Sequence, residues 1–138
     1  MLDFSSPFGR RVKQHLRKEH VLWLTTVDAR GTPQPRPVWF LWDGRSFLIY
    51  SQPDTGKVRH IHRNPRVALH LNSDVHGDDF AVFLGEARVR RTRPAGDRKA
   101  AYLRKYRRSI KKLGMTPEGF FQAYSVPIEV RPEAMRGW

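Results

Sequence analysis

The chain has 138 residues, no cysteine and a formal net charge of +13 at pH 7. The lack of cysteine excludes disulfide bonds and thiolate metal sites, and it is typical of a reducing compartment, so we expect a cytoplasmic protein. No stretch has the length and hydropathy of a signal peptide or a membrane span, so we expect no membrane association. A hydrophobic content of 39% over this length predicts one globular domain, residues 1–138.

The positive charge is concentrated in residues 88–112. This segment holds twelve Lys or Arg side chains and one acid, Asp97, which gives +11 of the total +13. Such a density favours a polyanionic partner, whether nucleic acid, anionic lipid or a ligand with several phosphates or carboxylates. The alternative is a solvated helix face without a partner.

The first half of the chain predicts one helix and three strands. Ser5, Ser6 and Pro7 form a helix start, and the spacing of Val12 and Leu16 places both on one buried face. Apolar and β-branched runs at residues 21–28, 32–42 and 46–52 are separated by short turns, of which Asp43-Gly44 is a strong hairpin signal. The three runs therefore predict a meander.

Three alternating prolines distinguish the second of these strands. Pro33, Pro35 and Pro37 cannot donate ladder hydrogen bonds, and in an extended chain all three face the same neighbour. One flank of this strand is therefore unpaired. It is either an ordinary sheet edge or the wall of a ligand cleft.

The second half predicts three helices and three strands. A short helix over residues 54–64 is followed by strands at 66–73 and 79–91. From Arg98 to Leu113 an apolar stripe alternates with a basic half, which predicts a helix whose stripe docks on the sheet while the basic side, Arg98 and Lys105 included, faces outward. Thr116 and Pro117 start another helix, and residues 126–132 form a sixth strand. Short hairpins with helices between them favour a mainly β, α+β fold: a six-stranded antiparallel split barrel with peripheral helices.

The stretch YSQPDTGKV places Thr55, Gly56 and Lys57 at the start of a helix. Free N–H groups, the helix dipole and a lysine in the first turn together make an anion site, although a capped helix start without a ligand has the same sequence. A Walker loop is excluded, because Ser51 stands where it needs Gly and Val58 where it needs Ser or Thr.

Metal and nucleophile motifs are absent from the sequence. His60 and His62 are two residues apart on a helix, hence on different faces, and His70 alternates with apolar residues of a strand. No nucleophile or general base stands out. If the protein is an enzyme, we expect a cofactor to carry the chemistry.

Residues 31–71 resemble the pyridoxamine 5′-phosphate oxidase-like, flavin-binding split β-barrel family. RPVWF (36–40) is similar to that family's Arg-x-Val-Leu-Leu strand, and YSQPDTGKVRHIHRNPRV (50–67) to its Tyr-Thr…Ser-Arg-Lys…Asn-Pro-Arg-Val segment at the same spacing. The wider pattern, including VWFLWDG and the ending AYSVPIEVRPEAMRGW, looks most like the actinobacterial branch that uses the deazaflavin coenzyme F420.

The resemblance implies an oxidoreductase that transfers hydride from reduced coenzyme F420, or from FMN as the alternative, to a small organic acceptor. It implies a homodimer with cofactor sites in grooves between subunits. Trp138 is a candidate either for the acceptor pocket or for dimer packing. The cofactor-binding residues that it implies, from the ring system to the phosphate end, are Arg36, Pro37, Val38, Trp39, Tyr50, Ser51, Gln52, Thr55, Gly56, Lys57 and Val58.

Two positions depart from the flavin-binding pattern. Gly56 replaces the arginine before the lysine, and Leu41 replaces the lysine that ends the strand motif. Both weaken a grip on the flavin phosphate and favour a cofactor with further anionic groups, such as the polyglutamate tail of coenzyme F420, which the basic segment 88–112 is a candidate to hold. Two other functions stay open: a cofactor carrier without turnover, and a basic nucleic-acid-binding module, which lacks a recognisable reading helix.

Overall fold

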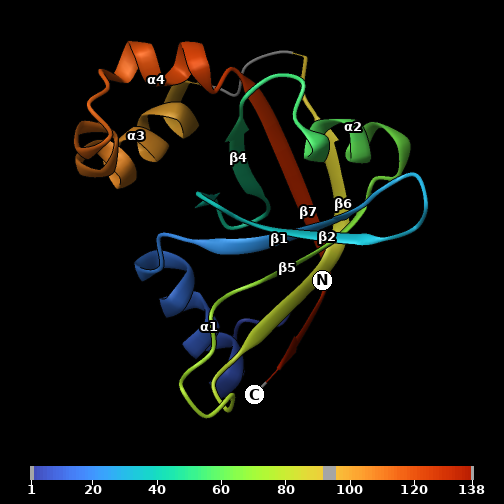
Figure 1. The fold of residues 1–138 in the computed structure, drawn as a ribbon. Coiled ribbons are helices and arrows are strands. Elements are labelled where there is room, and N and C mark those ends of the chain that lie inside the picture. Colours follow the sequence, from blue (N-terminus) through green and yellow to red (C-terminus); the bar gives the residue numbers. More distant parts are fainter. Residues whose placement is uncertain (1, 92–95, 138) are drawn as a thin grey trace.

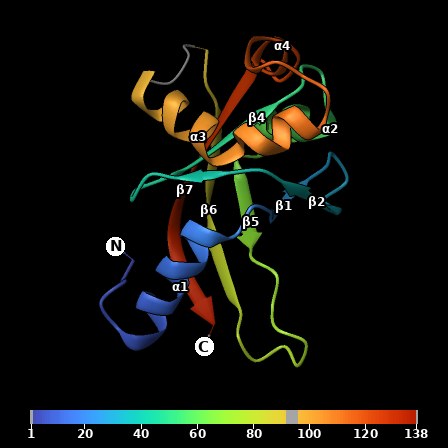
Figure 2. The same ribbon diagram turned by 90° about the vertical axis from the view of Figure 1, so that its left-hand side faces the viewer.

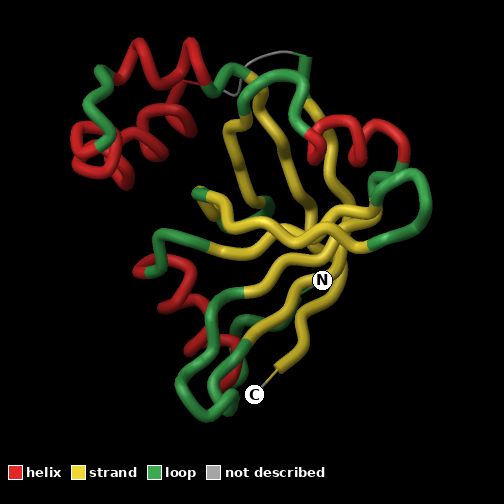
Figure 3. Tube along the Cα trace, in the orientation of Figure 1, coloured by secondary structure: helices red, strands yellow, loops and turns green. Residues whose placement is uncertain are grey.

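In the computed structural model, which describes residues 2–91 and 96–137, all strands join one antiparallel sheet. Within those residues there are seven strands: β1 (Leu22–Val27), β2 (Pro33–Val38), β3 (Leu41–Trp42), β4 (Phe47–Ser51), β5 (Arg66–His70), β6 (Ala81–Val89) and β7 (Val126–Gly137). Their spatial order is β2-β1-β5-β6-β7-β4-β3. The sheet curls into a half-barrel (Figures 1 and 3), which confirms the mainly β, α+β architecture, with seven strands instead of the six predicted.

The extra strand arises because the predicted strand 32–42 is broken at Trp39 and Phe40. Its first part, β2, pairs with β1, and its last two residues form β3, which pairs with β4. Both predicted hairpins are present, but the meander is wrong: β2 and β3 are consecutive in sequence and lie at opposite edges of the sheet. The three prolines lie on an edge strand of the sheet, as one of the two interpretations predicted, since β2 has a neighbouring strand on one side only.

Strand β7 continues past the predicted end at residue 132. Its register against β6 shifts between Leu84 and Gly85, so that Leu84 faces Ala134 while Gly85 faces Pro132. A proline is tolerated at such a bulge, and the strand resumes beyond it. Gly85 is required there, because a Cβ atom would lie 2.2 Å from the carbonyl oxygen of Arg131.

The helices cover the two ends of the curled sheet. They are α1 (Pro7–Lys18), α2 (Gly56–Arg63), α3 (Gly96–Lys112) and α4 (Pro117–Ala123). Figures 1 and 2 both place α1 at the opposite end from α2, α3 and α4. None of these helices is long and apolar enough to cross a membrane.

Two hydrophobic clusters hold the fold together. The larger one joins α1 and α2 to the concave face of the sheet, and Val12 and Leu16 belong to it as predicted. The smaller one packs α3 and α4 against β4 through Leu48, Tyr50, Tyr102, Tyr106 and Phe120. This second cluster forms one wall of the cavity described next.

Candidate cofactor site

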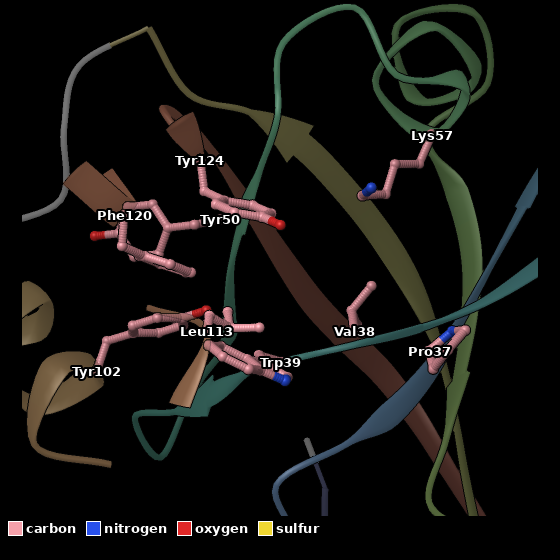
Figure 4. Close-up of a pocket in the computed structure, with 9 residues that line it drawn as sticks. All are labelled: Pro37, Val38, Trp39, Tyr50, Lys57, Tyr102, Leu113, Phe120 and Tyr124. Atoms are coloured by element: carbon pink, nitrogen blue, oxygen red, sulfur yellow. The ribbon is translucent and has the colours of Figure 1, made fainter. Parts of the chain in front are cut away.

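A cavity of about 280 Å³ opens between the end of β2, strand β4, the start of α2 and the helix pair α3 and α4 (Figure 4). One side carries a cation and the other is aromatic. Nine residues line it: Pro37, Val38, Trp39, Tyr50, Lys57, Tyr102, Leu113, Phe120 and Tyr124.

Lys57 supplies the cationic side. It lies in the first turn of α2, and its side chain extends toward the open space across from the aromatic residues (Figure 4). Burial lowers the pKa of Lys57, and repulsion from the nearby Arg36 lowers the pKa further. Lys57 is partly buried and Arg36 is exposed, and an anion bound near both would offset their mutual repulsion.

The start of α2 adds hydrogen-bond donors to this side. Thr55 is the N-cap residue, but its side chain makes no capping bond to the helix. Its hydroxyl lies 3.1 Å from the hydroxyl of Ser51, which donates to the carbonyl of Gln52 at 2.8 Å. The Thr55 side chain therefore leaves the first amides of α2 uncapped, and these amides sit at the positive end of the helix dipole.

Gly56 leaves room beside these amides. A Cβ atom at this position would lie 3.5 Å from Cε1 of His60 and 3.9 Å from a guanidinium nitrogen of Arg59. His60 is held by Thr26, whose buried hydroxyl lies 2.8 Å from the ring Nδ1. A Cβ atom at position 56 would therefore meet only ordinary van der Waals contacts.

The aromatic side is built around Trp39. Its ring stacks on Tyr106 at a centroid distance of 4.7 Å and on Phe120 at 5.6 Å. Tyr50 meets Tyr102 edge to face at 4.8 Å. Burial raises the pKa of Tyr102 far above its usual value, so its hydroxyl stays protonated. These rings form an aromatic wall of the cavity, against which a planar ligand could pack.

The structure brings five of the eleven sequence-predicted site residues together in the cavity lining: Pro37, Val38, Trp39, Tyr50 and Lys57. The other six lie beside the lining. Arg36 is close enough to Lys57 to affect its pKa, Ser51 and Val58 are buried, Gln52 is exposed, and Thr55 and Gly56 start α2. Their role as cofactor ligands stays a prediction.

Sequence reasoning missed the contribution of α3 and α4. Tyr102 belongs to the apolar stripe for which only docking on the sheet is predicted, and Phe120 and Tyr124 carry no site prediction. Leu113 was predicted to dock on the sheet, but its side chain is 55% exposed at the cavity mouth. Helical periodicity reveals that a side chain faces inward, and it does not distinguish a filled core from a cavity wall.

The basic half of α3 is also different from the prediction at two positions. Arg98 pairs with Asp43 at 3.1 Å and with Glu129 at 3.0 Å, and Lys105 donates to the carbonyl of Phe40 at 2.9 Å, so neither simply faces solvent. The remaining cations on this side of α3 are exposed: Arg104, Arg107, Arg108, Lys111 and Lys112. In Figure 1, α3 and α2 lie on opposite sides of β4 and β7.

Three further features of the sequence concern possible metal ligands, His70 and the C-terminal tryptophan. Within residues 2–91 and 96–137, no three His, Cys, Asp or Glu side chains cluster as metal ligands. His70 stacks on Trp23 at 6.2 Å, outside the two clusters of buried apolar residues. Trp138 and residues 92–95 of the basic segment lie outside the described residues.

Residues 8–138 match the family model of pyridoxamine 5′-phosphate oxidase. None of the curated proteins matches the chain. Among solved structures, an F420 reductase is 28% identical with a TM-score of 0.68, covering 90% of this chain and 94% of that one.

Two further solved structures share the fold at lower identity. HutZ, the heme storage protein of Vibrio cholerae, is 16% identical with a TM-score of 0.66, and the match covers 93% of this chain and 92% of that one. A conserved hypothetical protein from Mycobacterium tuberculosis is 18% identical with a TM-score of 0.73, at 94% and 82% coverage.

Proposed function

The chain belongs to the pyridoxamine 5′-phosphate oxidase family, and from this premise we propose that it is an oxidoreductase that uses the deazaflavin coenzyme F420. The observation that carries the proposal is the cavity itself, which places Lys57, with Arg36 nearby, opposite a wall of aromatic rings. A planar ring system with an anionic group at one end matches this arrangement, because its ring would face the aromatic residues and its anionic group would face Lys57.

Three features favour the deazaflavin over FMN. The F420 reductase with the matching fold is 28% identical to this chain. Gly56 and Leu41 stand where the flavin-binding pattern has cationic side chains, so the grip on a flavin phosphate is reduced. The wider sequence pattern also resembles the branch, of actinobacterial type, that uses coenzyme F420.

In the proposed complex, Lys57, Arg36 and the first amides of α2 hold the anionic part of the coenzyme. Trp39, Tyr50 and Tyr102 orient the ring and exclude water from one of its sides. When bound and reduced, the deazaflavin supplies a hydride to an electrophilic organic acceptor. Burial keeps Tyr102 as a neutral hydroxyl, which is a very weak acid but is able to donate a hydrogen bond to the ligand.

The cavity does not fit haem equally well. The nine lining residues include no histidine, cysteine or methionine, so of the usual haem ligands only tyrosine is present in the lining. FMN remains the alternative cofactor, because the same cations would serve its phosphate. We further propose a homodimer, since the cavity is bordered by the unpaired flank of β2.

Oxidation of chemically reduced coenzyme F420 in the presence of a panel of electrophilic acceptors, such as quinones, enones and nitroaromatics, tests the activity. We expect the absorbance of the oxidised coenzyme to return faster with wild-type protein than with Lys57→Ala. Tight coenzyme binding without turnover of any acceptor would instead identify a cofactor carrier.

A nucleic-acid-binding role is the second candidate, because five exposed cations share one side of α3. Its signature is salt dependence. A nucleic-acid binder should bind DNA or RNA tightly below physiological salt and lose affinity steeply as salt rises.

A further inference from the structure

The cavity wall contains a short segment that the sheet does not hold. Trp39 and Phe40 lie between the last β2 residue, Val38, and the first β3 residue, Leu41, and the ladder registers pair neither of them. Because β2 and β3 are the two edges of the sheet, this segment spans the opening of the half-barrel. Something else must fix the direction in which the Trp39 ring points.

Helix α3 makes the contacts that hold this segment. The hydroxyl of Tyr106 accepts from the amide N–H of Phe40 at 2.8 Å, and its own proton is donated to the carbonyl of His20 at 2.7 Å or of Phe40 at 3.0 Å. Lys105 donates to the Phe40 carbonyl and lies 3.6 Å from the centroid of the Phe40 ring. Both backbone polar groups of Phe40 are thus satisfied by side chains of α3.

The same Tyr106 side chain also contacts Trp39. The two rings are stacked at 4.7 Å with an interplanar angle of 2°. Tyr106 is completely buried, and it is not among the residues that line the cavity. One side chain therefore holds the backbone on one side of Trp39 and the ring of Trp39 itself.

We infer that Tyr106, supported by Lys105, is a positioning residue that fixes the Trp39 wall and thereby sets the affinity for the ring portion of the ligand without touching the ligand. The inference rests on the proposed function for the nature of that ligand, a planar ring system joined to a phosphate group. The placement of Trp39 by Tyr106 does not depend on it.

Tyr106→Phe is the test variant, because it removes the hydroxyl and keeps the stacked ring. Isothermal titration would compare coenzyme F420, FMN and inorganic pyrophosphate as a probe of the Lys57 side. We expect the ring-containing ligands to bind roughly tenfold more weakly, because the Phe40 backbone beside Trp39 loses its hydrogen bond to the Tyr106 hydroxyl. The affinity for pyrophosphate should not change.

A double-mutant cycle with Trp39→Ala separates positioning from general stability. If Tyr106 acts through Trp39, Tyr106→Phe will not weaken ring binding further once Trp39 has been removed. An equal loss of affinity in both backgrounds would overturn the inference. Lys105→Met should weaken ring binding in the same direction, with Lys18→Met, an exposed lysine of α1, as the control for loss of one positive charge.

Amide hydrogen exchange tests the same contact without any ligand. In Tyr106→Phe, the Phe40 amide should exchange at least about tenfold faster, since its acceptor is gone. The Ala87 amide, which donates to the Pro65 carbonyl at 2.8 Å, is the remote reference and should not change. Failure of wild-type protein to bind either cofactor would refute the proposed function alone, whereas unchanged exchange at Phe40 would refute the role of Tyr106.

Discussion

At Lys57, burial and the positive charge of Arg36 both act against the protonated form, and both lower its pKa. An anion bound beside Lys57 should reverse this effect and draw a proton onto the amine. We therefore expect the affinity for pyrophosphate, or for the phosphate-bearing cofactor, to fall as pH rises through the lowered pKa of Lys57, below the ordinary value of 10.5. Titration calorimetry across alkaline pH measures the affinity directly.

The variant Lys57→Ala should remove this pH dependence and weaken cofactor binding by roughly ten- to a hundredfold, the range for one charge-assisted hydrogen bond. Lys13→Ala, an exposed lysine of α1, is the control for loss of one positive charge. Unchanged affinity in Lys57→Ala would show that the anion binds elsewhere.

Gly56 is the residue at which we expect cofactor preference to be set. A Cβ atom at this position would have no neighbour closer than 3.5 Å, and we expect Gly56→Arg to fold. It restores the cation of the flavin-binding pattern, and the affinity ratio should shift toward FMN relative to coenzyme F420. Gly56→Ala, which adds bulk without charge, is the matched control, and an equal shift in both variants would contradict the electrostatic explanation.

The protonation of Lys105 is expected to make the stability of the protein depend on pH. Burial lowers its pKa to about 8, while the charge of Glu19 opposes the shift. In the unfolded chain the pKa of Lys105 is about 10.5, so the unfolded state binds this proton more tightly than the folded state. The free energy of unfolding of the protein therefore increases as pH rises from about 8 to 10.5. We expect a gain of about 2 kcal/mol for this partly exposed side chain.

Urea unfolding of wild-type protein and Lys105→Met at several pH values isolates this contribution, since other titrating groups cancel in the difference. The stability difference should change in favour of wild type as the pH rises. A difference that is constant with pH would show that Lys105 titrates normally.

Among the structural elements, the pairing of β6 with β7 depends on Gly85. A Cβ atom there would lie 2.8 Å from Cα of Pro132 and still closer to the Arg131 carbonyl, so the bulged strands would have to separate. We expect Gly85→Ala to cost about 2–3 kcal/mol of unfolding free energy. Gly96→Ala, with nothing within 4 Å, is the control and should be neutral in thermal melts.

Most elements were predictable from local sequence, and the clearest exception, the break between β2 and β3, has a long-range cause. Strand β2 was recognisable as an edge from its alternating prolines, and α2 from the apolar spacing after Thr55. The break at Trp39 had no local signal, because VWFLW is a good strand sequence throughout. The break depends on Tyr106, whose hydroxyl accepts a hydrogen bond from the amide of Phe40, 66 positions earlier in the chain.

Across the whole molecule, the cationic half of the site was predictable and the aromatic half was predictable only in part. Lys57 and Arg36 belong to one contiguous stretch whose motif resembles a known family. Tyr102, Phe120 and Tyr124 come from helices more than forty residues later, and only the curling of the sheet brings them opposite Lys57. The spacing of these residues in the sequence does not indicate that they lie opposite Lys57 in the fold.

The measurement that tests the central claim most directly is titration of the purified protein with oxidised coenzyme F420 and, separately, with FMN, followed by quenching of tryptophan fluorescence. Trp39 lies in the cavity wall and should respond to a bound ring. We predict saturable, micromolar binding of coenzyme F420 and weaker binding of FMN, with the quenching lost in Trp39→Phe. Tighter binding of FMN, or no binding of either cofactor, would contradict the account.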